Sequence, residues 1–189
     1  MNKFSNHQFD KQAKKYNNYY IDRFISMKCS VDMMIARLFP NAKEITESFA
    51  AFEATKFLPA EYSWANPYIV VVCPGDGNTP RTAATFAFRS RWTTYSIDPL
   101  LKKTDYGIQR LKCIKDCIQH VKLSFEVPVL IANVHSHAKL TQCLQAISAP
   151  KICIINIPCC VASDISKPTR EYVDTNIWSE KNRVEIYEF

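Results

Sequence analysis

The sequence predicts a doubly wound α/β domain with a mostly parallel sheet, preceded by a helical N-terminal extension. From residue 68 onward, short β-branched runs alternate with longer segments, most of which have helical periodicity. Strands that alternate with helices form right-handed βαβ units, whose strands lie parallel in one sheet. Most of the runs are also almost continuously apolar, as in a sheet that is buried on both faces.

The first part of the chain, to about residue 56, has the spacing of helices. Apolar side chains recur every three or four residues, at Ile21, Phe24, Ile25, Val31, Met34, Ile35 and Leu38. Lys28 interrupts this stripe, which leaves one helix or two open. Pro40 ends the stretch, and Asn41 is a suitable first residue for the next helix. We therefore expect a helical extension over residues 1–60 and the α/β domain over 61–189. The helices form either a layer on the sheet or a lid over an acceptor site.

The strands of the α/β domain follow from the apolar runs. They are expected at 68–73, 93–97, 127–134, 152–157 and, as a final strand, 183–189, with helices at 80–90 and 138–148. The segment 108–121 is ambiguous. Its apolar spacing fits a helix, but Leu111–Ile114 would also make a short strand.

Composition limits the class of protein. The chain has 189 residues, enough for one well-cored domain, and its 47% hydrophobic and 22% charged content is ordinary for a globular protein. No apolar window is long enough for a transmembrane helix, and the first residues lack the apolar run of a secretory signal. We expect no membrane association.

Cysteines and charge add two expectations. The eight cysteines include no CxxC pair, and several lie in apolar runs, so we expect reduced thiols and a cytoplasmic protein. The net charge of +6 is compatible with a nucleic-acid partner without requiring one, because most such excesses are solvated surface.

A glycine loop follows the first predicted strand. The chain has only three glycines, and two of them, Gly75 and Gly77, lie two residues apart there. A strand, a GxG turn and a helix start together form the usual layout of a nucleotide-cofactor site. Asp98 ends the next strand, at about the interval where an acidic residue binds ribose hydroxyls. The alternative is a plain strand-to-helix turn.

Two residues of the loop bear on the choice of cofactor. Pro80 replaces a third glycine and removes an N–H donor where a pyrophosphate would bind, and Asp76 adds a negative charge there. Both favour a cofactor without phosphate that carries positive charge, as S-adenosylmethionine does. Phosphate-bearing cofactors come second.

The stretch VVVCPGDGNTPRTA, followed by YSIDP, resembles motifs I and II of the class I S-adenosylmethionine-dependent methyltransferases. The resemblance covers about residues 66–189 and implies a Rossmann-like fold. It implies that the loop lines the methionyl side, that Asp98 binds the ribose, and that Asp116 lies near the adenine with Cys117 against the ring. An acid at that place favours the strand at 110–115. The predicted cofactor-binding residues are Pro74, Gly75, Asp76, Gly77, Thr79, Asp98, Asp116 and Cys117. Thr79 is also the expected cap of the following helix.

Two further motifs follow later strands. NVHSHA ends the strand at 127–134, and IPCC ends the strand at 152–157. They loosely resemble methyltransferase-like domains, some tRNA-modifying, that carry a His/Cys segment and a PCC segment at these places. On an extended backbone His135 and His137 face the same side, and both are candidate catalytic residues, one as a general base. The alternative is that they only form loop hydrogen bonds.

A metal site made by both histidines with Cys159 and Cys160 also competes. Against it, adjacent cysteines on an extended backbone point in opposite directions, and zinc sites normally use CxxC-type spacing. The sequence analysis therefore assigns no metal. A Cys–His nucleophile pair is disfavoured because nothing in the sequence orients it.

The sequence thus predicts an S-adenosylmethionine-dependent methyltransferase whose acceptor is RNA, protein or a small molecule. Its alternative is a catalytically silent methyltransferase-like protein that binds or regulates a partner, since motif I is shortened and no D/NPPY motif is present. An enzyme with another nucleotide cofactor is third.

Overall fold

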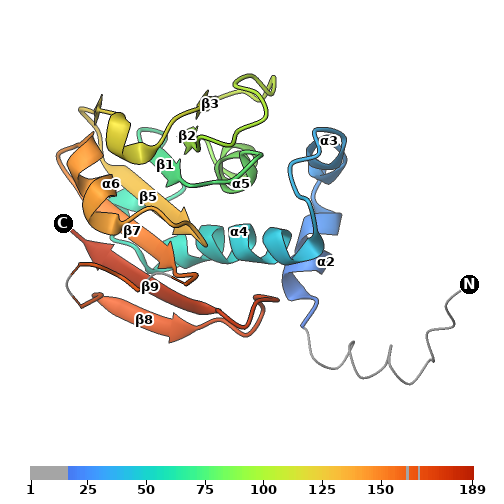
Figure 1. The fold of residues 1–189 in the computed structure, drawn as a ribbon. Helices are drawn as coiled ribbons and strands as arrows, with labels where there is room; N and C mark the ends of the chain where they lie inside the picture. Colours follow the sequence, from blue (N-terminus) through green and yellow to red (C-terminus); the bar gives the residue numbers. More distant parts are fainter. Residues whose placement is uncertain (1–16, 161, 166) are drawn as a thin grey trace, which may run out of the picture.

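The computed structural model describes residues 17–160, 162–165 and 167–189, and its centre is a seven-stranded sheet (Figure 1). The strand order is β3-β2-β1-β5-β7-β9-β8. The strands are β1 Val70–Pro74, β2 Thr93–Ile97, β3 Leu111–Ile114, β5 Val129–Val134, β7 Ile152–Ile157, β8 Arg170–Val173 and β9 Arg183–Glu188. The short strands β4 (Leu123–Ser124) and β6 (Ile147–Ser148) pair separately.

The sheet is mostly parallel, as predicted. β1, β2, β3, β5 and β7 run parallel, whereas β9 is antiparallel to both β7 and β8. β9 therefore lies in the reverse direction between β7 and β8, which run the same way as each other. The order 3-2-1-4-5-6 of dinucleotide-binding folds has no such insertion. This reversed strand distinguishes the fold from that of the dinucleotide-binding enzymes.

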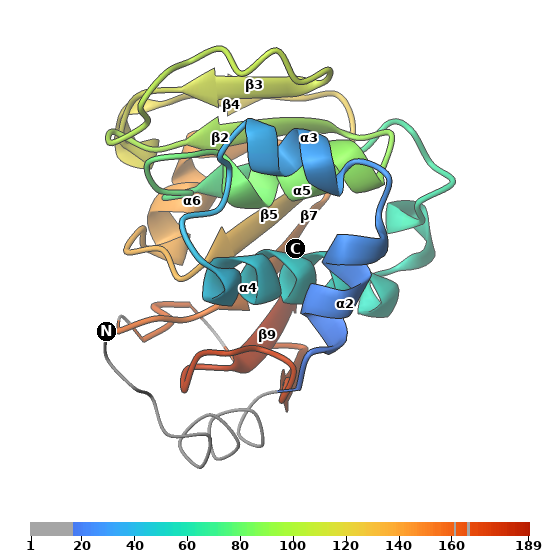
Figure 2. The ribbon, with the colours of Figure 1, turned by 90° about the vertical axis from the view of Figure 1, so that its right-hand side faces the viewer.

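Both faces of the sheet are covered, which explains the continuously apolar strands. On one face, Val71, Leu130 and Ile155 pack with side chains from α4 (Ala42–Ala54) and α5 (Arg81–Arg89). On the other face, Val72, Ile131 and Ile154 pack with side chains from α6 (Leu140–Ala146). Figure 2 looks onto the first face, where α2 to α5 lie in front of the strands.

Between residue 17 and α4 the structure describes two helices, so Lys28 lies between two helices and not within one. They are α2 (Tyr19–Ser26) and α3 (Ser30–Ile35). α4 begins where predicted, because the Asn41 side chain accepts a hydrogen bond from the Glu44 N–H. Phe49 and Phe52 of α4 belong to the same buried cluster as the sheet, so this helix forms a layer on it. Residues 1–16 of the predicted extension lie outside the described part.

The apolar stripe of the first helices is only partly buried. Of the predicted positions, Phe24 and Leu38 are buried, whereas Ile25, Val31, Met34 and Ile35 are exposed. Met33, which lies outside the predicted stripe, is buried. Helical spacing thus predicted the helices correctly and their buried faces only in part.

The remaining element predictions can be compared directly. The strands at 93–97 and 152–157 have the predicted bounds, and 108–121 contains the strand β3 rather than a long helix. β5 starts at Val129, later than expected. β8 has no counterpart in the prediction, because its sequence REYV is short and polar and lies at the sheet edge. Among the described residues, every helix is too short or too polar to cross a bilayer.

Candidate functional site

The glycine loop leaves the carboxyl end of β1 in a conformation that requires glycine. Gly75 has φ +62° and Gly77 has φ +86°, in the left-handed region that side chains disfavour. The Gly75 N–H donates to the carbonyl of Ile97, 2.7 Å away, and the Gly77 N–H donates to Asp98 Oδ2 at 2.8 Å. The loop is thereby fastened to the end of β2.

The space over both glycines is taken by side chains of the chain itself. A methyl group added to Gly75 would lie 2.1 Å from Ser136 Oγ, and one added to Gly77 would lie 2.2 Å from a guanidinium nitrogen of Arg81. Arg81 Nε in turn lies 2.8 Å from Glu44 Oε2. The close approach that the glycines permit is made in this structure by Ser136 and Arg81.

The Asp76 side chain has its hydrogen-bond partners within the chain, and its role in cofactor binding stays a prediction. Its side chain is buried and accepts hydrogen bonds from the N–H groups of Thr82 and Ala83 and from Ser96 Oγ, at 2.9, 3.1 and 3.0 Å. The carboxylate therefore faces the start of α5. Burial raises its pKa, while Arg81 and these donors oppose the rise.

The prediction that Thr79 caps α5 is wrong, because Asp76 accepts the hydrogen bonds from the start of that helix. The Thr79 hydroxyl donates to the carbonyl of Leu38 at 2.5 Å, and α5 begins after Pro80 without a cap from that residue. Asp76 supplies the acceptor that Thr79 was expected to supply. Thr79 thus ties the glycine loop to the segment before α4. Pro74, the last residue of β1, is buried.

Asp98 lies directly after β2, at the expected place. It is 7% exposed, and its two oxygens accept from Gly77 N–H at 2.8 Å and Leu100 N–H at 2.7 Å. A carboxylate offers about four lone-pair positions, so each oxygen keeps one for a further donor. Its role as a ribose ligand stays a prediction.

Asp116 and Cys117 follow β3, whose parallel pairing with β2 brings them to the same sheet edge as Asp98. Asp116 Oδ1 accepts from the Cys117 N–H at 2.7 Å and lies 2.9 Å from His120 Nδ1. The bond to His120 and then the bond to Cys117 hold the pKa of Asp116 below its usual value. The Asp116 side chain is 48% exposed, so it is accessible to a ligand.

The two predicted catalytic histidines separate. His135 has φ +47°, which turns the chain after β5, so the extended geometry that would put both rings on one side is absent. His135 Nε2 lies 3.1 Å from the Lys181 carbonyl and 3.5 Å from Glu47 Oε1. His137 Nε2 lies 3.2 Å from Cys160 Sγ instead. The expectation that both histidines face the same side is wrong.

The environment of His135 weakens it as a base. Burial, followed by the positive charge of Lys43, lowers its pKa to about 4. Because a carbonyl can only accept, the bond to Lys181 places the proton on Nε2. Because its pKa is about 4, the His135 ring is neutral at pH 7. A general base works best when its pKa lies near the working pH, so this position is poorly suited to that role.

A cavity of 540 Å³, which we call the loop cavity, lies beside the glycine loop. Its lining contains Gly77 and Thr79 of the predicted set, together with Arg37, Lys102 and Glu44. The volume is in the range of cofactor pockets. Cations and a carboxylate suit the carboxylate and the ammonium group of an amino acid, which is one end of S-adenosylmethionine.

The fit to that cofactor is thus partial. The loop cavity has the size and the charges for it, and Asp98 lies beneath the same loop, bonded to Gly77. Against this, Ser136 occupies the space over Gly75, and the Arg81 guanidinium occupies the space over Gly77. Binding over the whole loop would require both side chains to move.

The sheet order with reversed β9 and the glycine loop after β1 define a Rossmann-like fold of the class I S-adenosylmethionine-dependent methyltransferase type. Among solved structures, a mutant of MtNAS in complex with S-adenosylmethionine has a TM-score of 0.50 to this chain. The two are 11% identical, and the match covers 89% of this chain and 69% of MtNAS. At that identity the likeness concerns the fold.

Two weaker matches accompany it. A second structure of the MtNAS mutant has 12% identity, a TM-score of 0.46, and coverage of 89% of this chain and 67% of that one. A candidate O-methyltransferase from Nostoc punctiforme has 13% identity, a TM-score of 0.39, and coverage of 70% and 42%. No family model matches the chain, and no curated protein matches it.

Sequence reasoning missed the residues that close the site. Ser136 lies between the two histidines that drew attention, and only the three-dimensional packing brings its hydroxyl onto Gly75. Arg81, the first residue of α5, pairs with Glu44 and is largely buried. Arg81 and Glu44 lie on different helices and far apart in the chain, so no local sequence pattern indicates that they pair.

Proposed function

We propose that this protein is an S-adenosylmethionine-dependent methyltransferase whose cofactor binds at the carboxyl ends of β1 and β2, entering through the loop cavity. The observation that carries the proposal is the glycine loop, whose two left-handed glycines are fastened to the end of the neighbouring strand, Gly75 through Ile97 and Gly77 through Asp98. In a doubly wound sheet this edge is where ligands bind.

Three charged residues of the loop cavity and two aspartates outside its lining have separate roles in this proposal. Arg37 and Lys102 bind the carboxylate of the cofactor, and Glu44 binds its ammonium group. Asp98 accepts hydrogen bonds from the ribose hydroxyls, and Asp116 is accessible beyond it on the side of β3. When bound, the cofactor supplies a methyl group on a sulfonium, which an acceptor nucleophile can attack.

The acceptor side belongs to the ends of β5 and β7. His137 is exposed there, whereas His135 is enclosed between Glu47 and Lys181. Of the two predicted catalytic residues, His137 is the better placed to meet an acceptor from solvent. Methyl transfer depends first on alignment of the nucleophile with the sulfonium, so a base adds to a rate that positioning already provides.

Calorimetry with S-adenosylmethionine, S-adenosylhomocysteine and NAD tests the cofactor. We expect binding of the first two and none of NAD. Asp98→Ala should weaken S-adenosylhomocysteine binding by about 1.5–3 kcal/mol, because hydrogen bonds to a charged acceptor are lost. Glu126→Ala is the matched control, since this exposed acid precedes the amino end of β5, at the opposite edge of the sheet. Equal affinity in Asp98→Ala and in the control would remove Asp98 from the site.

A second candidate function has its own supporting observation. Ser136 over Gly75 and Arg81 over Gly77 are what a silent, partner-binding member of the fold would carry, because they replace a ligand by side chains. This candidate predicts no heat of binding with either adenosyl compound. If binding is found, methyl-labelled cofactor offered separately with RNA, protein and small amines identifies the acceptor class.

A further inference from the structure

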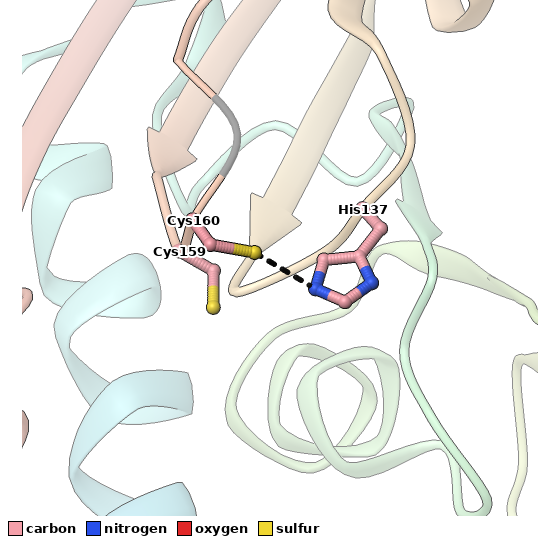
Figure 3. A group of neighbouring side chains, drawn as sticks. All are labelled: His137, Cys159 and Cys160. Carbon is pink, nitrogen blue, oxygen red and sulfur yellow. Dashed lines mark hydrogen bonds between the residues drawn. The ribbon is translucent and has the colours of Figure 1, made fainter.

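Three soft metal-ligand atoms converge at the ends of two neighbouring strands. His137 follows β5, and Cys159 and Cys160 follow β7, which pairs with β5 in parallel. Cys160 Sγ lies 3.2 Å from His137 Nε2, and the ligand atoms of all three residues lie within 4.8 Å of one another (Figure 3). We call these three residues the rim cluster.

One of the two arguments against a metal at this place depended on an extended backbone, and that condition fails here. β7 ends at Ile157, and the chain bends at Cys159 and Cys160. The alternation of side chains across a strand therefore does not apply to this pair. His135 takes no part, because its ring turns toward Glu47. The set that forms is His137 with both cysteines, and not the four residues that the sequence suggested.

The spacing of the rim cluster is close to that of a tetrahedral zinc site. Zinc bonds of about 2.3 Å to sulfur and about 2.0 Å to nitrogen place ligand atoms about 3.6–3.8 Å apart. The observed upper limit of 4.8 Å requires a contraction of about 1 Å, which side-chain rotation supplies. Two thiolates and an imidazole are also the donors that Zn²⁺ prefers.

Simpler explanations account for only part of the rim cluster. A hydrogen bond or a nucleophile pair between Cys160 and His137 would explain those two residues, but would leave Cys159 beside them without a role. Asp116, Cys117 and His120 form the other described group with suitable spacing. There, however, Asp116 already accepts from Cys117 N–H and pairs with His120, so its contacts explain its geometry without a metal.

We propose that His137, Cys159 and Cys160 bind one Zn²⁺ ion and leave its fourth coordination position open. Three protein ligands with an open position are the arrangement of catalytic rather than structural zinc. Both cysteines line a cavity of 640 Å³ that also contains Arg183, Glu171 and Tyr187. The open position is therefore accessible to water or to an oxygen or sulfur atom of a substrate. This proposal does not depend on the identity of the cofactor at β1 and β2.

Metal content tests the proposal directly. The full chain, produced with supplemental zinc and purified under reducing conditions, should retain one zinc ion after dialysis. Cys159→Ser, Cys160→Ser and His137→Ala should each lower the Zn²⁺ affinity by at least about 100-fold, since losing a residue that only orients a ligand already costs about 10–100-fold. His120→Ala and Cys117→Ser are the matched controls and should keep the wild-type zinc content.

Substitution with Co²⁺ gives a second measurement that reports on the ligands themselves. Wild-type protein should show tetrahedral cobalt bands and a thiolate charge-transfer band. The charge-transfer band should fall to about half in either cysteine variant, because one of two thiolates is lost. The proposal is overturned if the reduced wild-type protein binds neither Zn²⁺ nor Co²⁺. It is equally overturned if the rim variants keep their metal, or if the His120 variant loses it.

Discussion

The glycine loop and the rim cluster lie on the same edge of the sheet and differ in how their polar groups are used. In the loop, the carboxylates of Asp76 and Asp98 and the N–H groups of both glycines have partners within the chain. In the rim cluster, His137 and Cys160 are exposed, and their side chains contact each other. The loop is built into the fold, whereas the rim cluster is free to take an external ligand.

This difference shows that a recognisable sequence motif and a set of side chains available to a ligand need not coincide in this protein. The loop has the sequence motif, but its hydrogen bonds first of all hold β1, β2 and α5 together. The rim cluster has no recognised spacing, yet its atoms have the arrangement that a ligand needs. Substitutions should therefore affect stability strongly in the loop and weakly at the rim.

The largest expected loss of stability is that of Asp76→Ala, compared with Asp164→Ala. Each aspartate accepts hydrogen bonds from the first turn of a helix, Asp76 from α5 and Asp164 from α6. Asp76→Ala should lower the free energy of unfolding by about 3–5 kcal/mol, because it leaves three buried donors unpaired. Asp164 accepts from the Leu140 N–H at the start of α6 but is exposed. Asp164→Ala should cost about 0.5–2 kcal/mol. Urea unfolding of both variants measures the difference, and equal losses would abolish the contrast between a buried and an accessible region.

The next effect concerns the closeness of Ser136 to the loop. Gly75→Ala should cost about 2–4 kcal/mol, from left-handed strain and from overlap with Ser136. Gly107 has φ +65° with no atom near its would-be side chain, so Gly107→Ala should cost only about 1–2 kcal/mol. Adding Ser136→Gly to Gly75→Ala should recover part of the loss. If the double variant is no more stable than Gly75→Ala, then Ser136 is not what fills the loop.

The smallest effect depends on pH and concerns His135, which stands between the two regions. Its folded pKa of about 4 is below the ordinary 6.5, so the unfolded chain binds the proton more strongly. Stability is therefore full above about pH 6.5 and is lost as the pH falls toward 4. After allowance for solvent screening, the loss is about 2–3 kcal/mol.

His135→Asn tests this assignment, because asparagine tolerates the positive φ and does not titrate. The variant should lose less stability than the wild-type protein between neutral pH and about pH 4. Chemical unfolding at several pH values measures this. If both proteins lose the same stability as the pH falls, another group is responsible for the loss, and the pKa of His135 is not lowered in the folded protein.

Much of the fold was predictable because its signals are local. Continuous apolar runs identified β1, β5 and β7, and Asn41 identified the start of α4. β8 was missed because an edge strand buries little and so has no apolar pattern. The reversed direction of β9 was also beyond the sequence, since a strand has the same apolar period in either direction.

The candidate site was predictable in position but not in detail. Strand ends placed Asp98, Asp116 and both histidines on one edge, as the structure does. The side-chain partners depend on tertiary contacts, such as Thr79 with Leu38 and Ser136 with Gly75, which join distant parts of the chain. The rim cluster depended on one backbone bend after β7 and one positive φ at His135, neither of which has a sequence signal.

The Gly77 N–H already occupies one lone pair of Asp98 Oδ2, so a ligand that binds this oxygen at the same position must displace it. A ligand that needs the occupied lone pair of Asp98 gains only the difference between its own bond and the one that it displaces. A ligand that uses the free lone pairs displaces nothing. The loop therefore favours ligands that approach Asp98 from the side away from Gly77. Under the function proposed above, adenosyl compounds would be distinguished by the direction of their hydroxyl donors rather than by their number.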